Sequence, residues 1–233
     1  MAKRYDPADW DYIWALLLLT VATGIGDGVS YLGLDRVFTG NMTGNVLFIG
    51  FALAGDTTIP LLNNVLALGG FVVGATVASL IVRGKSHPSR LSDHAMLIIL
   101  VGALVSLGLG TTWAVLQTLP PVLMLAVTMT LAVVMGAQAA AVKATGIVDV
   151  STIVVTNTLA NLAMDSPLAG GAGAKSGRRI GAILCMAIGG FVGAMFVLHL
   201  GGGGFGLIAE GVLMLVALLL LQSARRREAA RLA

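Results

Sequence analysis

Long apolar runs follow one another along this chain and constrain its fold more than any other feature. Eight runs can be marked out: Ile13–Leu34, Val37–Ala54, Ile59–Val82, Ala95–Leu119, Val122–Val142, Ile147–Met164, Ile180–Leu200 and Phe205–Gln222. A helix needs about 20 apolar residues to cross a bilayer, whereas a membrane barrel shows alternating segments of about 10. These runs do not alternate. The sequence therefore predicts an all-α polytopic membrane protein, with residues 1–233 as a single membrane domain.

The composition supports a lipid environment and excludes several kinds of site. Of the 233 residues, 57% are hydrophobic and 11% are charged, against about 25% charged in soluble domains. The net charge of +3 comes from Lys and Arg in loops and tails, so the expected partner is the lipid bilayer and not nucleic acid. The one cysteine and the three histidines share no ligand spacing, so no disulfide, metal or cofactor is expected.

The positions of Lys and Arg predict how many runs cross the membrane. Four basic clusters occur, at residues 3–4, 83–90, 175–179 and 225–231. If all four are cytoplasmic, an even number of crossings separates each neighbouring pair. Three runs lie between the first two clusters and three between the next two, so one run in each group should not cross. We expect these to be Val37–Ala54 and Ile147–Met164, which leaves six spans and both termini in the cytoplasm.

Two halves of the chain resemble each other, which predicts an inverted repeat. Three segments of the first half match three of the second in the same order: Gly24–Leu32 with Gly136–Ala144, Asn41–Leu47 with Val154–Ala160, and Leu68–Ala75 with Ile188–Ala194. With three crossings in each half, residues 121–222 would be inverted relative to residues 12–119. This 3+3 architecture is common among transporters.

The stretch TGNMTGN at Thr39–Asn45 places polar residues and glycines inside an apolar run. Glycine in a helix costs about 1 kcal/mol relative to alanine, and Asn and Thr favour helix starts. We predict an extended or coiled segment over Val37–Met42, with Thr43 or Asn45 capping a short helix that runs to Ala54. In the second half, Thr156 or Thr158 would cap an equivalent short helix.

These two broken or re-entrant segments are the predicted binding site. Helix N-termini carry free N–H groups and partial positive charge, which suits a small polar or anionic solute. The predicted solute-binding residues are Asn41, Thr43, Gly44, Asn45, Gln138, Thr156, Asn157 and Thr158. The alternative is that these polar groups only hold helices together, as such residues do in membranes.

Two acidic residues lie within predicted spans. Insertion of Asp27 at a helix centre costs about 2.5–3.5 kcal/mol, so we expect it to carry a proton, bind a cation or pair with a base such as Arg36. The structural alternative is a static bond from Asp27 to Arg36 or to the backbone. Glu210 is expected to reach the outer interface, and the alternative is that it lines a pathway through the bundle.

The segment GGAGAKSGRR at Gly170–Arg179 superficially resembles a phosphate-binding loop. It lacks the G-x-x-x-x-G-K-[ST] spacing and the preceding strand. We expect a flexible basic cytoplasmic loop and no ATP site.

The segment from Gly24 to Gly55 resembles the YoaK family of prokaryotic membrane proteins. The residues that carry the resemblance are Gly24, Asp27, Val37, Phe38, Asn41, Met42, Thr43, Gly44 and Asn45. The resemblance extends over nearly the whole chain, including Met135–Ala163. This chain has Gln138-Ala139 where the family tends to have Q-N, and Thr156-Asn157-Thr158 where it tends to have T-G-T. The resemblance implies a multi-pass protein of the bacterial cytoplasmic (inner) membrane with about six spans.

These features predict a secondary transporter or channel-like permease, driven by an ion gradient or by the solute's own gradient, with proton coupling through Asp27. The alternative is a non-transporting membrane scaffold or regulatory subunit. No nucleophile–base pair or metal cluster is evident in the spans, so an enzyme is not expected. The run Gly70–Gly74 suits either internal packing or a homodimer interface.

Overall fold

The computed structural model describes residues 7–83, 91–143, 155–173 and 175–232. These residues form eight α-helices and one 3-10 turn: α1 (Pro7–Gly33), α2 (Met42–Leu53), α3 (Leu61–Val82), α4 (Asp93–Leu116), α5 (Pro121–Lys143), α6 (Val155–Met164), η1 (Pro167–Ala169), α7 (Ser176–His199) and α8 (Gly203–Leu232). No strand occurs in these ranges. The prediction of an all-α membrane protein is confirmed.

Six of these helices are long and apolar enough to cross a membrane: α1, α3, α4, α5, α7 and α8. The two others arise from the runs that the charge pattern excluded from crossing. With 12 residues in α2 and 10 in α6, both are shorter than the roughly 20 residues that a span requires. Residues 147–154 of the sixth predicted run lie outside the described part of the chain.

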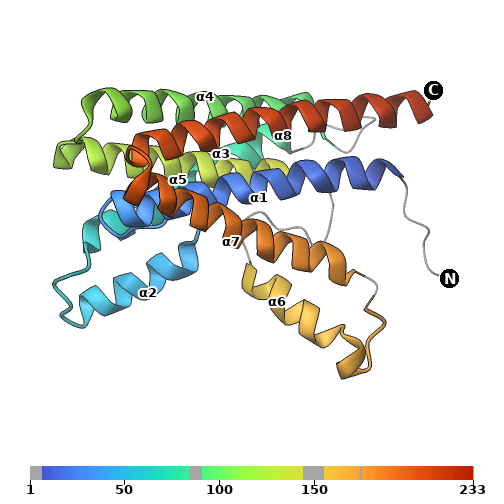
Figure 1. The fold of residues 1–233 in the computed structure, drawn as a ribbon, viewed down its shortest axis with the longest axis horizontal. Helices are drawn as coiled ribbons and strands as arrows, with labels where there is room; N and C mark the ends of the chain where they lie inside the picture. Colours follow the sequence, from blue (N-terminus) through green and yellow to red (C-terminus); the bar gives the residue numbers. More distant parts are fainter. Residues whose placement is uncertain (1–6, 84–90, 144–154, 174, 233) are drawn as a thin grey trace.

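The long helices run side by side along the longest axis of the molecule, and successive long helices alternate in direction (Figure 1). Both ends of the described chain lie at the same end of this bundle, together with the basic ends of α3, α7 and α8. The turns that join α2 to α3, α4 to α5 and α7 to α8 lie at the opposite end. The basic clusters that the structure describes therefore gather at one end, as the parity of charges requires.

Helix α1 lies at the centre of the bundle, packed mainly against α7 and α8. In its most apolar 18-residue window 78% of the residues are buried, against 17–44% for the other five long helices. Buried Tyr12, Ile13, Leu16, Leu19 and Ala22 follow one face of α1 into the main apolar core.

Glycines let two pairs of helices approach closely. Between α1 and α7, Gly24 faces Gly189, and a Cβ atom at Gly189 would collide with the carbonyl oxygen of Val21. Between α3 and α5, a Cβ atom at Gly74 would collide with the carbonyl of Val133. Small residues at such crossings are the rule in membranes. Gly70 and Gly74 therefore pack inside the protein. Both helix pairs, α1–α7 and α3–α5, join a helix of residues 12–119 to a helix of residues 121–222.

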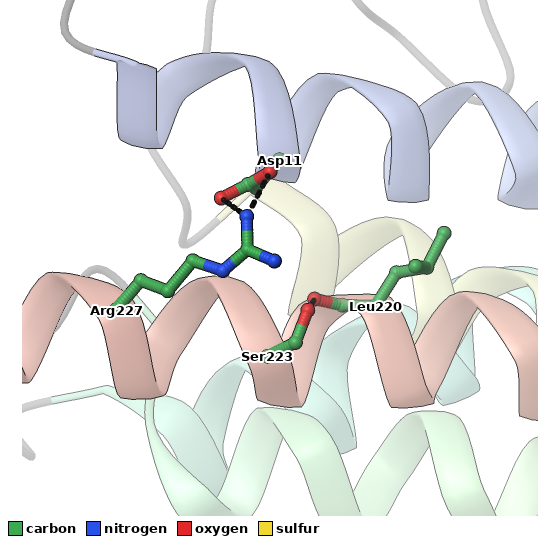
Figure 2. Close-up of polar contacts among 4 residues, drawn as sticks. All are labelled: Asp11, Leu220, Ser223 and Arg227. Carbon is green, nitrogen blue, oxygen red and sulfur yellow. Dashed lines mark hydrogen bonds and ion pairs between the residues drawn. The ribbon is translucent and has the colours of Figure 1, made fainter.

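Ion pairs hold the end of α8 to its neighbours at the basic end of the bundle. The Nη1 atom of Arg227 donates to Oδ1 and Oδ2 of Asp11 on α1, at 3.1 and 3.0 Å (Figure 2). One turn earlier, the hydroxyl of Ser223 donates to the carbonyl of Leu220 within α8 at 2.8 Å (Figure 2). The charged tail thus continues as an ordered helix beyond the apolar part of α8.

Candidate functional site

The chain leaves α1 through a tight turn and enters α2 after an irregular segment. Asp35 and Arg36 both have positive φ, 49° and 54°, a conformation that is uncommon for residues other than glycine. The segment from residue 37 to residue 41 is not helical. Irregular backbone at membrane depth must be bonded inside the protein or line a water-filled cavity, so the partners of its polar groups decide how it is held.

Asp27 binds this irregular segment from α1. Its Oδ1 atom accepts hydrogen bonds from the backbone N–H groups of Thr39, at 3.0 Å, and Gly40, at 2.7 Å. Gly40 lies so close that a Cβ atom there would be 3.3 Å from the carboxylate oxygens and 3.1 Å from Cγ2 of Thr23. The Asp27 side chain is therefore bonded to the backbone, the static arrangement that the sequence left as an alternative. Arg36 is exposed, and the described contacts of Asp27 do not include it.

Asn45 satisfies the backbone of the segment from the other side. Its Oδ1 atom accepts from the Phe38 N–H at 3.0 Å, and its Nδ2 atom donates to the Phe38 carbonyl at 2.7 Å. The side chain is fully buried. The amide of Asn45 therefore satisfies both polar backbone groups of Phe38, as the backbone of a neighbouring strand would in a β-sheet.

The N-cap of α2 is Asn41, whose Oδ1 atom accepts from the Gly44 N–H at 3.4 Å. The prediction that Thr43 or Asn45 caps this helix is wrong. The reason is that Asn45 is engaged with Phe38, so the helix starts one turn earlier. Gly44 fits beneath the ring of Phe38, where a Cβ atom would lie 2.8 Å from ring carbons.

Three aromatic rings cover the segment. Phe38 stacks on Tyr31 with ring centroids 4.8 Å apart and on Phe48 at 5.9 Å. Such stacking adds about 0.5–1.5 kcal/mol to the burial of each pair. The rings join the end of α1 to the face of α2 and keep the irregular backbone away from lipid.

The second polar segment forms the start of α6. Thr156, Asn157 and Thr158 all lie within the helix, which begins at Val155. The prediction that Thr156 or Thr158 caps it is therefore wrong: both lie in its first turn. Thr158 is buried, whereas Thr156 and Asn157 are exposed.

Arg179 anchors α6 to α7. Its Nη1 atom donates to the carbonyl of Asn161 at 2.8 Å and lies 2.7 Å from Oδ2 of Asp165. Arg178 and Arg179 are both buried. The prediction of a flexible basic loop over residues 170–179 is therefore wrong for its last residues. Helix α7 begins at Ser176, and Arg179 in its first turn bonds to the end of α6.

A cavity of about 630 Å³ lies where the two short helices begin. Helices α2 and α6 both start near the middle of the bundle and run outward in opposite directions (Figure 1). The polar side chains that line the cavity are Asp27, Tyr31, Asn41, Thr43 and Thr156. Apolar lining comes from α3 and α7 and from aromatic and methionine side chains, among them Phe38, Phe71, Met42 and Met186.

The structure thus brings together some predicted site residues and separates others. Asn41, Thr43, Thr156 and Asp27 share the cavity. Gly44, Asn45, Asn157, Thr158 and Gln138 are not among its lining residues. Gln138 lies in the bundle interior, where its Nε2 atom donates to Oγ1 of Thr23 at 3.1 Å.

The described lining of the cavity contains one carboxyl group and no Lys, Arg or His side chain. Within this described lining, the sources of positive potential are the starts of α2 and α6. At the start of α2, the N–H groups of Met42, Gly44 and Asn45 already bond to Gly40 or Asn41. A free anion is therefore poorly compensated in this cavity while Asp27 is charged.

Glu210 is a residue whose place the sequence prediction got wrong. It does not reach the outer interface: its side chain is 0% exposed and faces α1 at Gly26. Along α8, Glu210 belongs to a stripe of buried residues at spacings of three and four: Leu207, Glu210, Met214, Ala217, Leu221 and Ala224. A residue on such a stripe faces the bundle. The sequence of α8 does not single out this stripe, because residues on its other sides are apolar as well.

Comparisons with known proteins agree with this membrane architecture. Residues 15–220 match the family described as "Protein of unknown function (DUF1275)". The chain is also 36% identical over 157 residues to the UPF0700 transmembrane protein YoaK of Bacillus subtilis (strain 168). That match covers 64% of this chain and 65% of the length of the Bacillus protein. No solved structure matches the chain.

Proposed function

The chain belongs to the YoaK (DUF1275) family of membrane proteins, and on this premise we propose that it is a secondary transporter or channel-like permease for a small polar or anionic solute. The observation that carries the proposal is the cavity shared by Asp27 and the starts of α2 and α6. Broken helices that meet near the bilayer midplane form the solute sites of many transporters. We assign no catalytic role to the chain.

The size of the cavity limits the solute. Ligand pockets for small molecules enclose about 300–1,000 Å³, and 630 Å³ falls within that range. Hydroxyl and amide groups of Tyr31, Asn41, Thr43 and Thr156 offer both donors and acceptors. The aromatic and methionine lining would contact apolar parts of the solute. A small organic molecule with several polar groups fits this lining better than a bare inorganic ion.

The charge of the cavity suggests how transport would be coupled. An anion beside a charged Asp27 would be repelled, whereas an anion beside a protonated Asp27 would meet only the helix starts and neutral polar groups. A neutral polar solute would bind in either state. We therefore propose that Asp27 carries the coupling proton when the solute is anionic.

The packing of the long helices supports the predicted inverted repeat. Under that repeat, α1 corresponds to α5 and α3 corresponds to α7. The contacts α1–α7 and α3–α5 are then equivalent, and both are extensive crossings built on glycine. The repeat would bring α2 and α6 into the membrane from opposite sides. We place the basic end, and with it both termini, in the bacterial cytoplasm.

A non-transporting scaffold or regulatory subunit is the second candidate, and one observation favours it. Asp27 and Asn45 both use their side chains to bond the backbone of the irregular segment. A scaffold would have such polar groups mutually bonded and dry. The two candidates therefore differ in whether water and solutes enter the cavity.

Cysteine labelling tests whether the cavity is open. In a Cys185→Ala background, single cysteines replace Thr43 and Thr156, which line the cavity, and an impermeant thiol reagent is applied to cells and to inverted vesicles. Leu168, which is fully exposed, gives the positive control, and Ala103, which is fully buried, gives the negative control. A permease predicts reaction at both cavity positions. If both stay as unreactive as Ala103→Cys from either side, the scaffold candidate replaces transport.

Flux measurements test the coupling. The purified protein is reconstituted into vesicles containing a pH-sensitive dye, and neutral, anionic and cationic polar solutes are added under an imposed proton gradient. We expect solute-dependent proton entry in the wild type and its loss in Asp27→Asn. The amide that this substitution introduces still offers an oxygen to Thr39 and Gly40, so the variant should remain folded. Equal proton entry in both proteins would remove Asp27 from the coupling.

A further inference from the structure

Glu210 is a buried acid that the cavity does not include. It lies in the eighth position of α8, about 10 Å from the start of the helix at 1.5 Å per residue. Its side chain is 0% exposed, and both Oε1 and Oε2 lack a hydrogen-bond partner among the described residues. Buried polar groups are nearly always hydrogen-bonded, so two open carboxylate oxygens require an explanation.

Among the residues that the structure describes, no cation is bonded to Glu210 to balance its charge. Helix α8 packs against α1, α4 and α7. On α1 the nearest ionisable group in sequence is Asp27, which follows Gly26. Helix α4 has no ionisable residue between Ala95 and Leu116. On α7, Arg178 and Arg179 lie in the first turn, where Arg179 contacts Asn161 and Asp165 and Arg178 lies over the Trp10 ring. The rest of α7 contributes Cys185 in its middle and an exposed His199 at its end. An unpaired charge in such a place is strongly unfavourable, so the neutral acid is favoured there.

The missing side chain at Gly26 makes room for the carboxyl group of Glu210. A Cβ atom at Gly26 would lie 2.9 Å from Oε1 and 3.2 Å from Oε2 of Glu210. Glu210 therefore touches the backbone of α1 in the same helical turn that presents Asp27 to the cavity. The two carboxyl groups lie on neighbouring faces of this turn, one in the cavity lining and one in the bundle interior.

Other unpartnered polar atoms occur near this level of the bundle. The Oγ atom of Ser106 on α4 and the Oε1 atom of Gln138 on α5 are buried and have no partner among the described residues. Gly211, next to Glu210, packs against the carbonyl of Ala103 and the side chain of Leu107, which places Ser106 at the level of Glu210. The interior around α1 thus contains a group of polar atoms with unused hydrogen-bonding capacity.

We propose that Glu210 is an internal proton-binding residue that exchanges a proton with Asp27 across Gly26. This inference rests on the proposed transport function and adds a second carboxyl group to its coupling site. A proton from water in the cavity binds Asp27, moves to a carboxylate oxygen of Glu210 to form the neutral acid, and returns by the same route. One proton is bound and one is released in each cycle, and no electron is transferred. Glu210 is the group suited to store the proton, because Asp27 has two N–H donors to balance its charge and Glu210 has none among the described residues.

Carbodiimide labelling of the wild-type protein tests the proposal without any solute. Dicyclohexylcarbodiimide enters membranes and reacts with protonated carboxyl groups, and mass spectrometry distinguishes adducts on Glu210 from those on Asp27. We expect Glu210 to be labelled, with a rate that falls about tenfold per pH unit above the midpoint of its titration. Absence of an adduct, or a rate that is constant between about pH 5 and pH 9, would overturn the proposal. Protection by Na⁺ at constant pH would also overturn it, because the site would then bind sodium.

Two variants test the link between the carboxyl groups. Because interacting acids titrate together, Asp27→Asn should shift the midpoint of Glu210 labelling, and an unchanged midpoint would refute the exchange. Gly26→Ala keeps Glu210 but displaces its carboxyl group, so it should change the labelling rate several-fold. Gly108→Ala on α4 is the matched control, since a Cβ atom there meets nothing within 4 Å. Equal rates in Gly26→Ala and Gly108→Ala would contradict the assigned position.

The labelling experiment also separates this inference from the transport proposal. Proton binding at Glu210 is measured with no solute present, whereas transport is measured by flux. A Glu210→Gln variant that folds should lose the adduct and the coupled proton entry while it retains cysteine labelling at Thr43. If Glu210→Gln retains coupled proton entry, the inference fails and the transport proposal stands.

Discussion

The residues of the TGNMTGN stretch divide into those that build the site and those that face it. Asn45, together with Asp27 of α1, bonds through its side chain to backbone groups of residues 38–40. Asn41 and Thr43 are exposed to the cavity. The same residue type, asparagine, thus has two roles four positions apart: Asn45, inside α2, bonds to Phe38 of the irregular segment, whereas Asn41, the N-cap of α2, lies at the cavity.

Asn45→Ala should destabilise the protein much more than Asn41→Ala. Loss of the Asn45 amide leaves both polar backbone groups of Phe38 without a partner, which costs about 2–4 kcal/mol. Loss of the N-cap at Asn41 costs about 0.5–1 kcal/mol. The midpoints of thermal unfolding in detergent, followed by fluorescence, measure both. Equal losses would mean that the Asn45 bonds do not hold the segment.

Asp27→Ala and Asp27→Asn should differ in stability although both remove the ionisable group. Alanine leaves the N–H groups of Thr39 and Gly40 without an acceptor, at a cost of about 2–4 kcal/mol. Asparagine keeps an acceptor oxygen in the same place, so we expect a loss below about 1 kcal/mol. Thermal unfolding of the two variants decides this. A similar loss in both would show that the charge itself stabilises the fold.

The sequence located the polar segment that interrupts the apolar run, but it did not predict which side chains bond to the backbone of that segment. Thr39–Asn45 is recognisable because Gly, Asn and Thr interrupt an apolar run. The bond from Asn45 back to Phe38 spans seven residues, and the bonds from Asp27 to Thr39 and Gly40 span twelve and thirteen. No helical spacing encodes such contacts. The helix start was therefore misplaced even though the short helix was expected.

At the scale of helices, glycines lie where α1 contacts α7 and where α3 contacts α5, and they allow these helices to approach closely. The segments LGGF at Leu68–Phe71 and IGGF at Ile188–Phe191 matched in sequence, and each lies in a helix that crosses a helix of the other half. The sequence predicted Gly70–Gly74 as a small-residue contact, whereas the second segment was recognised only as its match in the repeat. It could not say whether Gly70–Gly74 packs inside the protein or against a second copy, because both uses need the same small residues.

Gly74→Ala should separate α3 from α5, whereas Gly69→Ala should not. A methyl group at Gly74 collides with the carbonyl of Val133, and one at Gly69 meets nothing within 4 Å. We expect a loss of about 1–3 kcal/mol from overpacking at Gly74 and a gain of up to about 1 kcal/mol from helix propensity at Gly69. Thermal unfolding compares the two. A stable Gly74→Ala variant would contradict the close approach of these helices.

At the scale of the molecule, charge and length predicted more than local chemistry did. The parity of basic clusters predicted that one run in each group does not cross, and the polar interruptions indicated which. The helices formed by these two runs are the short α2 and α6, and the described basic ends of α3, α7 and α8 do gather at one end of the bundle (Figure 1). Glu210 escaped prediction because its burial depends on which side of α8 meets α1. That choice is made by packing among helices distant in sequence.

Single cysteines at Thr118 and Leu168 should be labelled from opposite sides of the membrane. Both residues are exposed. Thr118 lies between α4 and α5 and Leu168 lies in η1 between α6 and α7, and these two connections lie toward opposite ends of the molecule (Figure 1). The positive-inside rule places the basic end in the cytoplasm. An impermeant reagent should therefore reach Thr118→Cys in intact cells and Leu168→Cys only in inverted vesicles. Labelling of both from the same side would refute the six-span topology.

The enclosure of α1 also orders events during biosynthesis. Among the described helices, α1 is synthesised well before α7 and α8, the helices against which it mainly packs. A nascent chain must keep an aspartate-bearing segment in the membrane while more than a hundred further residues are added. A transcript that ends before α7 would thus yield a chain with its central helix unsheltered, a natural target for membrane proteases. The central helix is therefore covered only in chains that extend through α7 and α8.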